Sequence, residues 1–189
     1  MIRLRPYQPL LLRILHSTNA IVIFAAIVSG LLIYDRFDAR LINLPLPEID
    51  LIIPLHSRIG TAMLLVFPLL ALYSFHIGQR RLLQEDTISK LSGSPRPSWW
   101  YALHRLVNTM LLITGAIALV SGRLMEAPWL PLGQLNQTWY LIHLASWVTI
   151  MLSILAHVLL VIKVGGIPLV LSIVSLRTRP ADWRNPFHP

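Results

Sequence analysis

The sequence predicts an all-α fold, a transmembrane four-helix bundle with a short C-terminal interfacial helix. The chain of 189 residues is 55% hydrophobic and only 13% charged, which lies outside the range of ordinary soluble domains. Its apolar residues gather in four stretches, each long enough to cross a hydrocarbon core of about 30 Å. Most of its basic residues flank these stretches, so the net charge of +8 reflects membrane topology and lipid contact. We expect no nucleic-acid partner.

The first span is expected at residues 10–34. This stretch is too long for the core of a secretory signal and no small-residue cleavage site follows it, so we interpret it as a membrane helix. Further spans are expected near residues 55–78, 101–122 and 138–162. Pro68 lies in the middle of the second span and should kink it.

The connector at residues 79–100 contains Ser, Gly and Pro with mixed charge, and it leads into an aromatic run suited to the lipid headgroup region. This run consists of Trp99, Trp100 and Tyr101. We interpret the segment as a loop with an anchor on the inner side of the membrane.

Beyond the fourth span, Gly165, Gly166 and Pro168 interrupt the helix, and the apolar run 167–176 is too short to cross the membrane. We expect this run to lie along the inner surface and to be followed by a polar tail. The chain then divides into two parts. Residues 1–163 form a four-helix transmembrane domain, and residues 164–189 form the interfacial helix and cytoplasmic tail.

The distribution of cations predicts the orientation. Twelve of the sixteen Lys and Arg residues lie on the side that carries both termini. The other side holds four, namely Arg36, Arg40, Arg58 and Arg123. By the positive-inside rule, we expect a multi-pass protein of the bacterial inner membrane, or an equivalent membrane, with both termini in the cytoplasm.

The chain has no cysteine, which excludes disulfides, iron–sulfur clusters, thiolate metal sites and covalent haem attachment. Histidine is the remaining strong metal ligand. All seven histidines except the last lie in or at the edges of the spans, where an unpaired polar group is costly. They are His16, His56, His76, His104, His143, His157 and His188.

Two of these histidines share one face of the fourth span. His143 and His157 are 14 residues apart, which at about 100° per residue returns to within about 40° of the same direction. The rise of about 1.5 Å per residue separates them by about 21 Å, which leaves room for one flat macrocycle near each leaflet. Each macrocycle would need a second axial ligand at the matching depth.

On the outer side, His56 is the only other span histidine at the depth of His143. On the inner side there are three candidates, and depth favours His16 as the partner of the second histidine in the fourth span. His76 lies about 200° around its helix from His56, so we expect it at the interface. His104 is expected there too, at a level that a quinone or a haem propionate could reach.

Four arginines are candidates to clamp haem propionates. Arg105 and Arg123 are 18 residues apart, five whole turns, and therefore share one face of the third span at its two edges. Arg13 and Arg58 lie close in sequence to His16 and His56 and are rival clamps. The alternative for all four is snorkelling to lipid phosphate.

Two glycines support the arrangement more weakly. Gly30 lies 14 residues after His16 and Gly60 lies one turn after His56, where a missing side chain would let a porphyrin approach the backbone. Small residues in membrane helices also serve plain helix packing.

This pattern resembles the bacterial di-haem cytochrome b561 family, which includes the cytochrome b subunits of nickel–iron hydrogenases and formate dehydrogenases. The resemblance covers residues 10–163 and rests on three motifs, LLRILHSTNAIVIFAAIVSG, PLHSRIG and LIHLASWVTIMLSILAH. In that family the haem ligands come from the first, second and fourth helices, which carries over onto His16, His56, His143 and His157. Ser17 stands where the family usually has Trp.

The resemblance implies two non-covalent b-type haems, each with bis-histidine iron, that pass electrons between quinone and a redox partner. That partner would be a dehydrogenase subunit or, in one branch of the family, superoxide, so it stays open whether the protein is an enzyme. An alternative is a haem-free scaffold or assembly subunit whose histidines bridge helices. A histidine-lined transporter is disfavoured because the span interiors lack carboxylates.

Overall fold

The computed structural model describes residues 8–125 and 135–175. Over these residues the chain is helical, with no strand, and four helices are long and apolar enough to cross a membrane. These are α1 (Leu10–Phe37), α2 (Ile52–His76), α4 (Pro97–Leu124) and α5 (Thr138–Val174). The predicted all-α transmembrane fold is confirmed.

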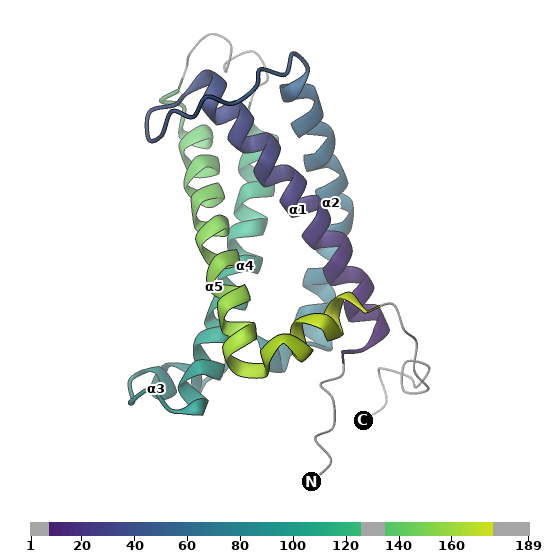
Figure 1. Ribbon diagram of the computed structural model, residues 1–189, viewed down its shortest axis with the longest axis vertical. Coiled ribbons are helices and arrows are strands. Elements are labelled where there is room, and N and C mark those ends of the chain that lie inside the picture. The colour runs from purple at the N-terminus through teal and green to yellow at the C-terminus, as the bar shows by residue number, and fades with distance from the viewer. Residues whose placement is uncertain (1–7, 126–134, 176–189) are drawn as a thin grey trace.

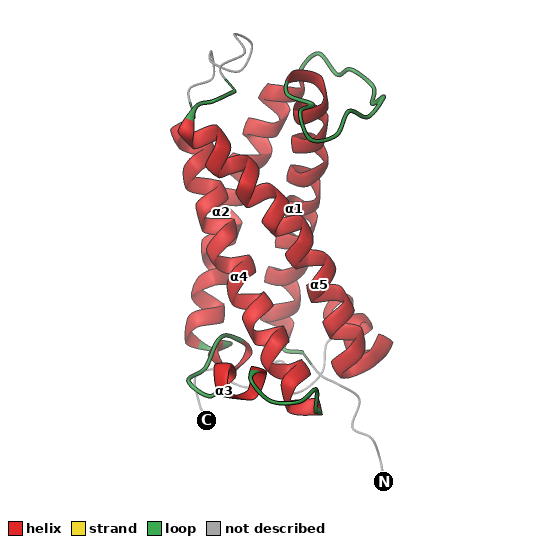
Figure 2. Ribbon diagram, turned by 90° about the vertical axis from the view of Figure 1, so that its left-hand side faces the viewer, coloured by secondary structure: helices red, strands yellow, loops and turns green. Residues whose placement is uncertain are grey.

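The four long helices run side by side along the length of the molecule, and the loops are confined to its two ends (Figure 1, Figure 2). Helix α1 packs mainly against α2, and α4 packs mainly against α5. Contacts between these two pairs are fewer and run through α1 with α5 and α2 with α4. The bundle therefore consists of two helix pairs that meet along a looser seam.

The bundle is apolar outside and partly polar inside, as expected when lipid is the solvent. Ile21 and Leu65 are exposed on the surface of the spans, whereas Asn19, Ser29 and Ser121 are buried. The buried amide ties two helices together, because Asn19 Nδ2 donates to the Val66 carbonyl oxygen across 3.2 Å.

The first three spans differ from the predicted boundaries by four residues or fewer, whereas α5 continues to Val174, beyond the predicted end at residue 162. Helix α2 stays helical through Pro68. Helix α4 begins at Pro97, which suits the first helical turn because its missing N–H has no partner to lose. The aromatic residues Trp99 and Trp100 therefore belong to the first turn of α4, where their rings meet edge to face with centroids 4.8 Å apart.

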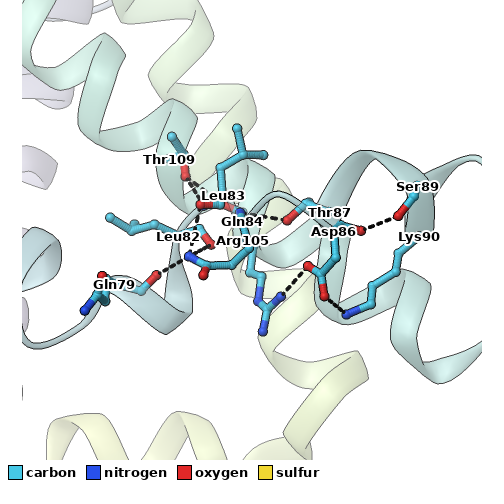
Figure 3. A network of polar contacts seen from close by, with 10 residues as sticks. All are labelled: Gln79, Leu82, Leu83, Gln84, Asp86, Thr87, Ser89, Lys90, Arg105 and Thr109. Carbon is cyan, nitrogen blue, oxygen red and sulfur yellow. Dashed lines mark hydrogen bonds and ion pairs between the residues drawn. The ribbon is translucent and has the colours of Figure 1, made fainter.

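The connector between α2 and α4 lies at the end of the bundle that the predicted orientation makes the inner one, and the opposite end is called outer. It contains a 3-10 turn, η1 (Gln79–Arg81), and a short helix, α3 (Thr87–Leu91). Figure 3 shows Asp86 at the centre of its polar contacts, hydrogen-bonded to Lys90 and 3.4 Å from Arg105 Nη1 on α4. The hydrogen bond from Lys90, together with the charges of Lys90 and Arg105, lowers the pKa of the Asp86 carboxyl below its ordinary value.

Side chains near the end of α1 form hydrogen bonds with the backbone of the outer loop, residues 38–51. Asp35 Oδ1 accepts the Leu44 N–H at 2.6 Å, and Arg36 Nη1 donates to the Ile49 carbonyl oxygen at 3.0 Å. The hydroxyl of Tyr34 accepts further backbone N–H groups of the loop. This loop therefore folds back on the outer end of the bundle.

Helix α5 bends after its membrane span, as the glycine and proline pattern predicts. Gly166 has φ 67° and ψ −176°, a conformation that is nearly restricted to glycine. The segment beyond it runs sideways to α1 at the inner end of the bundle (Figure 1), where Ser17 Oγ donates to the Ile173 carbonyl oxygen across 3.5 Å. The predicted polar tail lies outside the described residues.

Candidate functional site

The structure brings together the histidines that sequence depth and spacing had paired. On the outer side, the rings of His56 on α2 and His143 on α5 have centroids 6.1 Å apart at an interplanar angle of 86°. On the inner side, the rings of His16 on α1 and His157 on α5 are also 6.1 Å apart, with 29° between their planes. Helix α5 thus contributes one ring to each pair, and each pair bridges the seam of the bundle.

The outer rings have their Nδ1 atoms engaged. The Ser29 hydroxyl lies 2.7 Å from His56 Nδ1, and the Ala118 carbonyl oxygen lies 2.9 Å from His143 Nδ1. A carbonyl oxygen only accepts, so His143 Nδ1 carries the proton. The Nε2 atom of that ring then has a free lone pair, which is the form of imidazole that binds a metal.

Glycines border both outer rings. A Cβ added to Gly30 on α1 would lie 3.5 Å from His56 Cε1 and 3.3 Å from Trp147 Nε1, so this position is already packed and is not the open spot that the sequence suggests. A Cβ on Gly122 of α4 would lie 3.1 Å from His143 Cε1. At Gly60 a Cβ would meet no atom within 4 Å, which leaves space beside the His56 face.

His104 lies beside a proposed haem ligand and not at the membrane interface, where its position along the span had predicted it. Its ring centroid is 5.1 Å from that of His157, and its Nε2 is buried with no hydrogen-bond partner among the described residues. His76, by contrast, is exposed and its Nδ1 lies 3.0 Å from the carbonyl oxygen of Leu72 in its own helix. The inner side therefore holds three histidines, because the rings of His16 and His104 both lie near that of His157, although His104 was predicted to lie at the membrane interface.

Sequence comparison decides the family. The family model described as prokaryotic cytochrome b561 matches residues 7–175, nearly the whole chain. The protein belongs to the prokaryotic cytochrome b561 family. Comparison with the curated proteins and with the solved structures finds no match. The predicted family is confirmed, and this cytochrome is a membrane electron-transfer protein that uses b-type haem.

The ring separation of the cytochrome fits the cofactor. An iron between two opposed imidazoles requires two metal–nitrogen bonds of about 2.0 Å plus roughly 1 Å to each ring centre, a centroid separation of about 6 Å. Both the His56–His143 and His16–His157 pairs, at 6.1 Å, match this requirement. The separation of 5.1 Å between His104 and His157 is too short for it.

The candidate propionate clamps of the cytochrome lie in different surroundings. Arg13 is buried, 4% exposed, and its Nη1 donates to the Ser175 carbonyl oxygen at 2.5 Å, so it holds the C-terminal segment. Arg105 contacts Asp86 in the inner connector. Arg58 and Arg123 are exposed at the outer ends of α2 and α4. The structure therefore brings none of the four into a shared cluster.

Proposed function

We propose that this cytochrome holds two b-type haems and carries electrons between the two sides of the membrane. His56 and His143 ligate the outer haem, and His16 and His157 ligate the inner one. One observation carries the proposal: a single helix presents two imidazoles 14 residues apart, and the ring centroid of each lies 6.1 Å from that of a partner histidine.

The residues of the chain set the conditions for this transfer. When bound, the haems supply reversible one-electron chemistry, and no side chain has to break or form a bond. Ligand identity, burial and hydrogen bonds to the ligands tune the potential of each haem. The rise along α5 separates its two ligands by about 21 Å, so one haem serves each leaflet.

Quinone is the proposed membrane partner, exchanging electrons at the inner level. The support comes from His104, a half-buried histidine beside His157 whose Nε2 is free to bond a ligand. A quinone oxygen needs such a donor near the haem that reduces or oxidises it, because reduction of quinone takes up protons.

The second redox partner is proposed to act on the outer side and to be superoxide or a dehydrogenase subunit. Of the four outer arginines, Arg36 lies 3.6 Å from Glu48 and Arg40 pairs with Asp38. These pairs weaken any anion-attracting field, so that attraction would rest on Arg58 and Arg123. Direct kinetics with each partner would separate the two cases.

The test of the proposed function is a cofactor measurement on the purified full-length protein. A reduced-minus-oxidised visible spectrum should show the sharp alpha band of b-type haem, and the pyridine haemochrome assay should give two haems per chain. A colourless protein would favour the haem-free scaffold and overturn the proposal. One haem per chain would overturn the two-level arrangement.

A further inference from the structure

Asn108 connects the inner connector to a proposed haem ligand. Its side chain lies on α4 one turn beyond His104. On one side, Asn108 Nδ2 donates to the backbone carbonyl oxygen of Arg81 in η1 across 3.0 Å. On the other side, Asn108 Oδ1 lies 2.8 Å from Nδ1 of His157. A single amide therefore touches both the connector and the ring.

The Arg81 carbonyl fixes the orientation of the amide. A carbonyl oxygen only accepts hydrogen bonds, so the NH₂ group of Asn108 has to face it and the amide oxygen is left for the imidazole. An amide oxygen also only accepts, so Nδ1 of His157 has to carry the proton. The tautomer of His157 that exposes a lone pair at Nε2 is thereby selected by a backbone group of the connector.

The connector itself is held in place by neighbouring contacts. The Leu83 N–H donates to Thr109 Oγ1 on α4 at 2.9 Å, and Arg81 Nη2 donates to Gln8 Oε1 at 2.8 Å. Both bonds position the backbone around η1. The Arg81 carbonyl is therefore a fixed part of the fold.

We infer that Asn108 is a positioning residue for the inner haem, through which the fold of the inner connector sets the potential of that haem. The inference rests on the proposed function, in which His157 is an axial ligand. An acceptor on Nδ1–H makes an imidazole a stronger electron donor to its metal. Stronger donation stabilises ferric over ferrous iron and lowers the midpoint potential.

The outer site lacks this link. His143 Nδ1 bonds the Ala118 carbonyl oxygen within α4, and His56 Nδ1 bonds the Ser29 hydroxyl on α1. Neither partner also bonds a loop in the contacts that the structure describes. The inner haem alone is therefore expected to respond to substitution of Asn108.

The experiment is an optical redox titration of the purified full-length protein with its haems bound. Asn108→Leu keeps the approximate size of the side chain and removes the acceptor, so the inner haem should become easier to reduce. The reduced-to-oxidised ratio at a fixed ambient potential should rise at least threefold, which is a midpoint shift of about 28 mV at 59 mV per tenfold change. The midpoint of the outer haem should not move.

Two further variants separate the explanations. Asn108→Asp keeps an acceptor and adds negative charge, so it should lower the midpoint of the inner haem. Thr114→Val is the matched control, because it removes a hydroxyl that bonds the Met110 carbonyl oxygen within α4 and leaves both the connector and the Asn108–His157 contact in place. It should leave both midpoints unchanged.

Three results would overturn the inference. One is unchanged midpoints in both Asn108 variants, another is a shift in the same direction in both, and the third is an equal shift in Thr114→Val. If Asn108→Leu loses the inner haem, the Asn108→Asp variant tests the inference instead. A lower midpoint of the inner haem would support it, and an unchanged or higher midpoint would overturn it. Absence of haem from the unsubstituted protein would instead refute the proposed function, so the two failures are distinguishable.

Discussion

At the scale of single residues, hydroxyl groups on neighbouring helices hold the two rings of the outer histidine pair. Ser29 bonds His56, and Ser121 Oγ lies 3.2 Å from His143 Nδ1. An unpaired polar group in this environment costs on the order of 1–3 kcal/mol or more, so these contacts fix the directions of the rings as well as their stability. Small residues also help to position the rings, because they let an imidazole lie close to the backbone of a neighbouring helix.

Gly122 offers a test of this close approach. Gly122→Ala would place a Cβ 3.1 Å from His143 Cε1, so the ring has to shift from its partner. Overpacking of this kind costs about 1–3 kcal/mol, and we expect lower outer-haem content at unchanged inner-haem content, measured by redox-resolved visible spectra. Gly93→Ala is the control, since its nearest contact would be an ordinary 3.6 Å. Equal haem loss in both variants would contradict the prediction.

The directions of individual histidine side chains were harder to predict from the sequence than the positions of the membrane spans. Depth is read from position along a helix, and it paired His16 with His157 and His56 with His143. The direction of a side chain depends on how neighbouring helices rotate and pack, which a single sequence does not encode simply. His104 was therefore expected at the interface although its ring lies beside His157. Asn108 was missed because α4 was expected to supply no ligand.

At the scale of elements, the four spans were predictable because an apolar run longer than about 18 residues has few other uses. The short helix α3 was not predicted, since five residues do not form a stable helix alone. Contacts with α4 stabilise it, including the hydrogen bond that Trp99 Nε1 donates to the Leu91 carbonyl oxygen at 3.0 Å. The bend of α5 was predictable from its glycines and Pro168.

The inner connector should respond to acid. The pKa of the Asp86 carboxyl is lowered in the folded protein. Its ionised form therefore contributes fully to folding stability above the ordinary pKa of 3.8, and this contribution is lost as the pH falls through the lower pKa of the folded state. The protection factor of the Lys90 amide, which bonds the Asp86 carbonyl oxygen at 3.1 Å, should drop there in hydrogen exchange. In Asp86→Asn this acid step should be absent, whereas Glu85→Gln should keep it. An identical acid step in Asp86→Asn would refute the assignment.

The bend at Gly166 should be intolerant of a side chain. Alanine in this region of backbone conformation costs about 1–3 kcal/mol, so Gly166→Ala should release the segment that Arg13 and Ser17 hold against α1. Because the chain has no cysteine, Ile173→Cys gives a clean probe, and its rate of maleimide labelling should rise severalfold in the Gly166→Ala background. Unchanged labelling would show that the segment is held without the glycine.

At the scale of the whole molecule, the two helix pairs meet along a seam that both histidine pairs bridge. The α1–α2 pair supplies His16 and His56, and α5 supplies the rings opposite. Cofactors bound there would join the two pairs, so haem should contribute to folding stability as any ligand specific for the native state does.

The orientation of the bundle is a separate prediction. Asn43→Cys in the outer loop should react with a membrane-impermeant thiol reagent in intact spheroplasts. Ser94→Cys in the inner connector should react only after permeabilisation, because the excess of Lys and Arg retains that side in the cytoplasm. Both positions are exposed, so the difference reports the side of the membrane. The reverse pattern would refute the predicted orientation.

The most direct test of the central claim is a redox titration of two single-ligand variants. His143→Ala and His157→Ala should each bind one haem per chain instead of two, and the haem lost should differ between them by its midpoint potential. The exposed His76→Ala should keep both haems. If both α5 variants lost the same haem, or if neither lost any, the claim that α5 ligates one haem in each leaflet would be wrong.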